Sequence, residues 1–171
     1  MTKNPTTRAV VATIFFSVVA GWSVLFHDVP WDITIPHLIF YAVLTINTYF
    51  SIRFYTAFTP ESGAQTLIDG ALVALYAALA LTIGLPRTFA FLALVMFIVA
   101  TMKYAHLLGR TAYDKTLRKK IIIDSLGSLM CAAALGTAIL KYGVESAWLL
   151  AALFTFANIY LLLLRPMYRH P

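Results

Sequence analysis

Residues 88–108 read TFAFLALVMFIVATMKYAHLL, residues 109–120 read GRTAYDKTLRKK, and residues 121–140 read IIIDSLGSLMCAAALGTAIL. An α-helix needs about 20 mostly apolar residues to cross the hydrocarbon core of a bilayer, and both apolar runs meet that length. A short segment rich in Lys and Arg between two such runs is typical of a loop on the cytoplasmic side of a membrane. This stretch therefore predicts a hairpin of two membrane-spanning helices.

Four further apolar runs extend the pattern to six, at residues 9–26, 38–58, 67–84 and 147–164. The chain has 61% hydrophobic and 12% charged residues and a mean hydropathy of +0.82, whereas soluble domains carry about a quarter charged residues. Barrel strands are short and alternate in polarity, unlike these continuous runs. We expect an all-α membrane protein with a compact six-helix bundle over residues 1–171. No small-residue cleavage site follows the first run, so we expect that run to be retained.

The distribution of cations predicts the orientation. With the N-terminus in the cytoplasm, eleven of the 13 Lys and Arg residues fall on the inner side, where such residues are enriched in short loops. We therefore expect both termini to be cytoplasmic, in a bacterial-type inner (plasma) membrane. The inner cations are Lys3, Arg8, Arg53, Lys103, Arg110, Lys115, Arg118, Lys119, Lys120, Arg165 and Arg169, and the outer ones are Arg87 and Lys141.

The net charge of +6 lies beside the apolar runs, where anionic lipid headgroups attract cations. No nucleic-acid module is visible, so we expect lipids and no nucleic acid as partners. The basic segment sets topology, or it contacts anionic lipid or an acidic partner. Its cations are Arg110, Lys115, Arg118, Lys119 and Lys120.

Small residues recur at four-residue spacing in three of the runs. Because small residues allow helices to approach closely in lipid, we expect the first, third and fifth helices to form the packed centre, or the stripes to meet another subunit or a larger complex. The stripes are Thr13, Ser17 and Gly21; Gly70, Ala74 and Ala78; and Ser128, Ala132 and Gly136.

Ionisable residues near the inner ends of the helices form a candidate ion or solute path, because buried ionisable groups in membranes often mark such routes. They are Arg53, Asp69, Lys103, His106 and Asp124. The alternative is that they are boundary residues that reach for water and pair, Arg53 with Asp69 and Lys103 with Asp124. Asp124 shares a helical face with Gly127, Ser128 and Cys131, which indicates that it points at protein.

The second run is the most polar. Asn47, Ser51 and Tyr55 recur every four residues and share a face, and Asn158 lies near the same depth in the sixth run. Such residues either line a cavity or hydrogen-bond helices to one another, and both interpretations remain open. We include Asn47 and Asn158 in the candidate path.

Histidines and carboxylates gather before the second run, at His27, Asp28, Asp32 and His37. Imidazole and carboxylate together can bind a transition metal, but the spacing matches no defined motif. A turn shaped by Pro30 and Pro36 is the simpler interpretation, so we expect no metal. Cys131 is the single cysteine, which excludes an internal disulfide and a cysteine zinc site. No pair of mid-helix histidines is available for haem, and we expect no cofactor.

Three functions remain. The polar residues on several helices favour a small transport protein that moves an ion or small solute between the helices. A non-catalytic membrane subunit that docks onto a larger complex is the second. The third is a membrane enzyme acting on a lipid headgroup, although no sequence motif of a known catalytic site is present.

Overall fold

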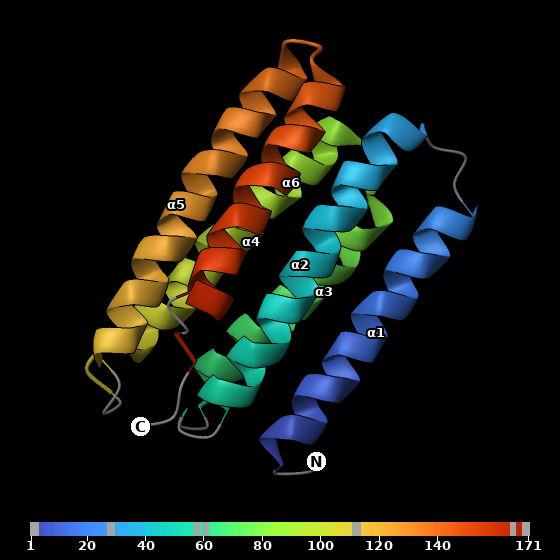
Figure 1. The fold of residues 1–171 in the computed structure, drawn as a ribbon. Coiled ribbons are helices and arrows are strands. Elements are labelled where there is room, and N and C mark those ends of the chain that lie inside the picture. The colour runs from blue at the N-terminus through green and yellow to red at the C-terminus, as the bar shows by residue number, and fades with distance from the viewer. Residues whose placement is uncertain are drawn as a thin grey trace.

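A computed structural model describes residues 4–26, 30–56, 59, 62–110, 114–164 and 167–168. Within these ranges the chain is helical and contains no strand, which confirms the all-α prediction. The helices run side by side in alternating directions (Figure 1). They are α1 (Pro5–Phe26), α2 (Trp31–Tyr55), α3 (Gly63–Leu81), α4 (Pro86–Leu107), α5 (Asp114–Ile139) and α6 (Gly143–Ile159), and α6 continues into the π-helical turn η1 (Tyr160–Leu164).

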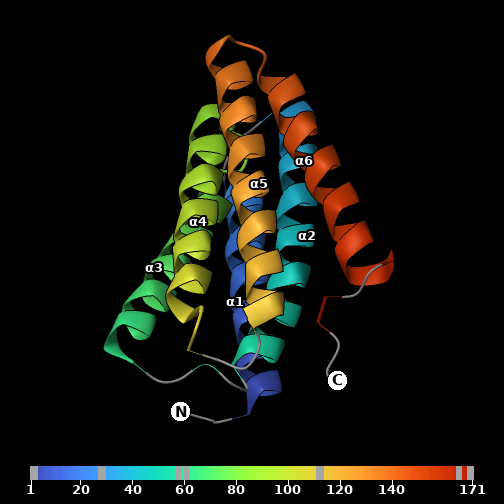
Figure 2. The same ribbon diagram turned by 90° about the vertical axis from the view of Figure 1, so that its left-hand side faces the viewer.

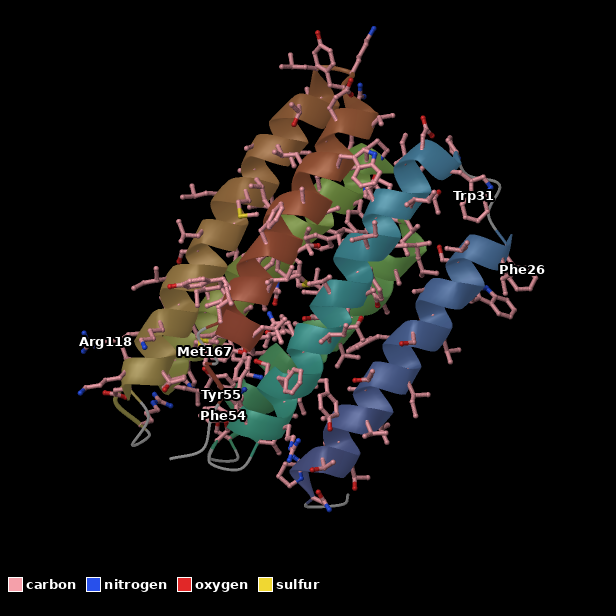
Figure 3. The ribbon with its side chains drawn as sticks, viewed as in Figure 1. Phe26, Trp31, Phe54, Tyr55, Arg118 and Met167 are labelled. Atoms are coloured by element: carbon pink, nitrogen blue, oxygen red, sulfur yellow. The ribbon has the colours of Figure 1, made fainter. Side chains whose placement is uncertain are left out.

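Six helices, counting α6 and η1 as one, are long and apolar enough to cross a membrane, as expected for a multi-pass integral membrane protein. The first helix begins and the last one ends at the same end of the bundle (Figures 1 and 2). We call this the basic end, because Arg87 and Lys141 are the only described Lys and Arg residues at the opposite end. At that opposite end the side chains of Phe26 and Trp31 are each 63% exposed (Figure 3), as aromatic residues of a membrane interface often are.

All six helices begin before their predicted apolar runs, and the difference is largest, about seven residues, for α2 and α5. The expected outer turn at residues 28–36 is largely helix, since α2 starts at Trp31 and includes Pro36. Pro36 has no backbone N–H, so α2 lacks one hydrogen bond near its start. Likewise α5 starts at Asp114, so most of the expected basic loop is helix. The Asp114 carboxylate accepts a hydrogen bond from Gly109 N (3.0 Å) and lies at the positive end of the helix dipole.

The packed centre is formed by α2, α4 and α6, and the prediction that the first, third and fifth helices form it was wrong. Phe40 of α2 lies against Phe89 of α4 and Phe154 of α6, with ring centroids 5.5 and 4.6 Å away. Phe97 of α4 contacts the same Phe154 ring at 5.7 Å. Large aromatic rings therefore fill the middle of the bundle together with buried alanines such as Ala93 and Ala151.

The small-residue stripes face outward. Gly21, Gly70 and Gly136 are exposed, and a side chain added at any of them would meet nothing within 4 Å. The close approach between helices occurs instead at Gly127 of α5, where an added Cβ would lie 2.9 Å from the ring of Phe97. Gly127 thus allows α5 to pack directly on the α4 ring that contacts Phe154.

Replacing Gly127 with alanine tests this packing. The new methyl group would force the buried Phe97 ring to move, and overpacking of this kind costs about 1–3 kcal/mol. Gly136→Ala is the matched control in the same helix, because its added methyl group enters open space. We expect a lower unfolding temperature in detergent micelles for Gly127→Ala alone, and equal temperatures for the two variants would contradict the packing.

Candidate functional site

A stripe of buried or half-buried polar side chains follows one face of α2 through the bundle. Residues spaced by three and four share a helical face, and this face turns toward α3 and α4. The stripe consists of His37, Tyr41, Thr45, Thr48, Ser51 and Tyr55. The α2 backbone packs closely on α1 and α6, while side chains fill the seam to α3 and α4. Asn47, Ser51 and Tyr55 were expected on a common face. All three are buried, and the stripe continues from Ser51 along α2 to His37.

His37 begins the stripe near the opposite end. Its ring stacks on Phe89 with centroids 3.9 Å apart, and Nδ1 accepts a hydrogen bond from Gly84 N at 3.1 Å. Gly84 has a φ of +91°, a left-handed conformation that other residues rarely adopt. His37 is fully buried, and its Nε2 has no hydrogen-bond partner among the described residues.

The weak metal candidates do not assemble. His37 lies inside α2, while Asp32 is exposed and accepts a hydrogen bond from Ile33 N at 3.1 Å. His27 and Asp28 lie outside the described residues. No group of three potential ligands that could hold a metal is found in the part of the chain that the structure describes.

The middle of the stripe contacts Tyr76 of α3. The Tyr41 hydroxyl donates to the Tyr76 carbonyl at 3.2 Å, and the Thr48 and Tyr76 hydroxyls are hydrogen-bonded to each other. Thr45 donates to the Tyr41 carbonyl at 2.8 Å. Part of the stripe is therefore satisfied within α2, and part links α2 to α3.

Toward the basic end, three elements meet at Ser51. Its hydroxyl lies 2.9 Å from the hydroxyl of Tyr104 in α4 and 3.4 Å from that of Tyr168, which follows η1. The Tyr168 hydroxyl donates to Asn47 Oδ1 at 3.0 Å. The rings of Tyr55 and Tyr104 lie 4.9 Å apart, and Figure 3 shows Tyr55 at the end of α2 near the segment after η1.

A buried ion pair completes this region. Lys120 Nζ lies 2.8 Å from Asp124 Oδ1, and the two side chains are 7% and 1% exposed. Lys120 Nζ also lies 5.6 Å from the centroid of the Tyr104 ring, within the range of a cation–π interaction. The second carboxylate oxygen, Asp124 Oδ2, has no hydrogen-bond partner among the described residues. We call Asn47, Ser51, Tyr104, Lys120, Asp124 and Tyr168 the basic-end site.

A second ion pair joins α3 to α4. Lys103 Nζ lies 2.7 Å from Asp69 Oδ1, and the Asp69 side chain is 49% exposed. Lys103 Nζ is 5.9 Å from the Tyr104 ring, so both ion pairs contact this tyrosine. The expected pairs, Arg53 with Asp69 and Lys103 with Asp124, were wrong, because each aspartate has a different lysine partner.

The other candidates lie apart from this cluster. The Arg53 side chain is exposed, and Arg110 donates to His106 Nε2 at 2.9 Å on the surface. Asn158 is buried in α6 and donates to its own helix at Phe154 O (2.9 Å), while its Oδ1 has no partner among the described residues. Lys115, Arg118 and Lys119 are exposed on α5. Lys120 differs from these neighbours because it lies inside the bundle.

A small cavity of about 90 Å³ adjoins the basic-end site at Tyr168. A water molecule needs about 10–15 Å³ of probe-occupied volume, so several fit. The lining residues are Phe50, Leu161, Leu162, Met167 and Tyr168.

Three members of the site were missed from sequence. Lys120 was counted with the exposed cations, although its spacing of four from Asp124 is that of an ion pair on one helical face. Tyr104 lies between Lys103 and His106 in the sequence, but only those two were predicted as site residues. Tyr168 lies beyond the last apolar run, and we find no sequence signal that places it against Asn47.

The chain matches no protein-family model, and neither a curated protein nor a solved structure matches it. Functional inference therefore starts from the site itself.

The buried ion pair can be tested by removing one partner and then both. Asp124→Leu leaves Lys120 buried without its counter-ion, which costs about 3–5 kcal/mol, whereas replacing both members of such a pair with apolar residues is often nearly neutral. We expect Lys120→Met to recover most of the stability lost in Asp124→Leu, as measured by unfolding in micelles. Asp69→Leu should cost less than Asp124→Leu, because the Lys103 and Asp69 side chains are 16% and 49% exposed and water screens the pair. A small loss for Asp124→Leu alone would contradict a buried pair in which Lys120 depends on Asp124 as its counter-ion.

Proposed function

We propose that this protein is a small membrane transport protein that moves an ion or small solute along the polar stripe of α2. The basic-end site would be one mouth of this route. The observation that carries the proposal is Asp124, which is 1% exposed within a helix apolar enough to cross a membrane. Ionisable residues in that setting commonly mark ion, proton or substrate pathways.

Unpartnered buried polar atoms support a route rather than helix adhesion alone. Buried polar atoms nearly always have a partner, water included, yet several have none among the described residues. They include His37 Nε2 in the stripe, Asp124 Oδ2 in the basic-end site and Asn158 Oδ1 in α6. A mobile hydrated substrate would supply partners to such atoms, whereas residues that only join helices would be satisfied by each other.

The dimensions favour a small substrate. The cavity at Tyr168 has a volume of about 90 Å³, and the phenylalanines of α2, α4 and α6 fill the centre beside the stripe. A proton, a small inorganic ion or a solute of similar size fits this space. The basic end is the proposed cytoplasmic side, with both termini there, in an inner (plasma) membrane whose anionic headgroups face the exposed cations.

Charge movement into liposomes tests the proposal. We expect purified wild-type protein to give currents on a solid-supported membrane when a gradient of protons, sodium, potassium or chloride is applied. Asp124→Asn should reduce that current at least about tenfold, because the amide keeps the size of the side chain and removes its charge. Ser51→Ala, which loses the hydroxyl between Tyr104 and Tyr168, should reduce it less.

The matched control is Glu145→Gln, the same change at an exposed residue of the opposite end, which should keep the wild-type current. Size-exclusion profiles and unfolding temperatures would show that each variant is folded. A wild-type current in folded Asp124→Asn would remove the basic-end site from the mechanism, and wild-type currents no larger than those of empty liposomes would contradict transport of these ions.

A membrane subunit is the second candidate, and the outward-facing small residues favour it. Gly21 of α1 and Gly70 of α3 are exposed with open space above them, and small residues allow another helix to approach closely in lipid. These faces suit a homo-oligomer or a larger membrane complex.

Extraction from native membranes in a mild detergent, followed by native mass spectrometry, tests the subunit candidate. A docking face on α3 predicts a stoichiometric partner with the wild type, and loss of that partner in Gly70→Leu without a change in unfolding temperature. Wild-type protein that leaves the membrane as a lone monomer would contradict this candidate.

A further inference from the structure

A groove of about 440 Å³ lies between α4 and α5 on the outer surface of the bundle. Its walls are largely apolar, and the hydroxyls of Thr101 and Ser128 donate to the carbonyls of Phe97 and Asp124 within their own helices. Such a surface suits a hydrocarbon chain. The lining residues are Leu94, Ile98, Thr101, Met102, Ser125, Ser128, Leu129 and Ala132.

The groove covers only part of the membrane depth. It ends at Leu94 and Ala132, well before the opposite ends of α4 and α5. Arg118, Ser125 and Ala132 are spaced by seven and share one face of α5, and the distance from Arg118 to Ala132 along the helix is about 21 Å. One leaflet contributes about 15 Å of hydrocarbon, so this face matches one lipid chain and its headgroup. A membrane-crossing helix would need a groove along the full length.

Positive charge lies where the headgroup would be. Lys115, Arg118 and Lys119 are exposed in the first turns of α5, and none of them forms an ion pair with a described acidic side chain. Figure 3 shows Arg118 at the left-hand edge of the molecule, on α5. The same side faces the viewer in Figure 2, where α4 and α5 lie side by side. Arg binds phosphate through paired hydrogen bonds, and juxtamembrane cations attract anionic headgroups.

We propose that the α4–α5 groove is a binding site for an anionic phospholipid, with one acyl chain lying in the groove as far as Leu94 and Ala132 and the phosphate on Arg118. The site is separate from the polar stripe of α2. It also differs from general attraction to the membrane surface, because it requires both the groove and Arg118, which lies about 10 Å along α5 from the groove residue Ser125.

Native mass spectrometry of the full-length protein in micelles, titrated with phosphatidylglycerol or phosphatidylcholine, tests the site. We expect wild-type protein to bind phosphatidylglycerol more tightly. Arg118→Gln should weaken phosphatidylglycerol binding about fivefold, the effect of one juxtamembrane charge, and leave phosphatidylcholine binding unchanged. Ala132→Phe, which fills the groove, should weaken binding of both lipids. The matched controls are Lys141→Gln, an exposed cation at the opposite end, and Ala133→Phe, an exposed neighbour that does not line the groove.

Equal binding of the two lipids by the wild type, or equal phosphatidylglycerol binding by Arg118→Gln and wild type, would overturn the proposal. Arg118 is exposed, so its substitution keeps this test valid even if Ala132→Phe does not fold. A change from dimer to monomer in Ala132→Phe without any change in lipid binding would show that a second copy occupies the groove, which also overturns it.

Discussion

Within a bilayer, a polar or charged side chain that turns inward must find its partner in the protein, because no bulk water is available. This constraint accounts for the arrangement around Asp124. Lys120, one helical turn from Asp124 on α5, lies inside the bundle and pairs with it. The Tyr104 ring lies against the ammonium group of Lys120. Tyr104 is in turn held by Ser51, and Ser51 and Asn47 are reached by Tyr168 from beyond the last helix. Residues from α2, α4, α5 and the C-terminal segment thus converge on one buried carboxylate.

The apolar centre and the polar stripe are two consequences of the same packing. Phenylalanines from α2, α4 and α6 bring these helices together on one side of α2. The neighbouring face of α2 meets α3 and α4 through long side chains, which allows His37, Tyr41 and Tyr76 to lie in the seam between backbones. Polar groups at several depths can then occupy one continuous face without opening the core. A route for a small substrate beside a packed aromatic centre is consistent with this division.

Hydropathy was enough to predict six helices, because only runs of this length and composition can cross a bilayer. Hydropathy did not predict the helix ends, because α2 and α5 begin within polar segments. Helical residues that lie outside the hydrocarbon need not be apolar. The buried positions of His37 and Lys120 were missed for that reason. Small-residue spacing did not predict the contact faces, because spacing does not reveal whether a face meets another helix of the chain or the surroundings. The close contact with Phe97 is at Gly127, which lies outside the three stripes. Partners such as Tyr168 depend on how the chain returns after α6, which no local pattern encodes.

A transport route that begins at the basic-end site must admit water there, and substituted-cysteine accessibility tests this most directly. Cys131, the single native cysteine, is buried and would be replaced by alanine. Ser51→Cys and Ile46→Cys would then be treated with a small cationic methanethiosulfonate reagent in proteoliposomes. Thiols react as thiolates, which form where water is present, and Ile46 is 51% exposed on the outside of α2, where lipid covers it. Our account predicts rapid modification of Ser51→Cys and little modification of Ile46→Cys, whereas equal and slow reaction at both positions would contradict it.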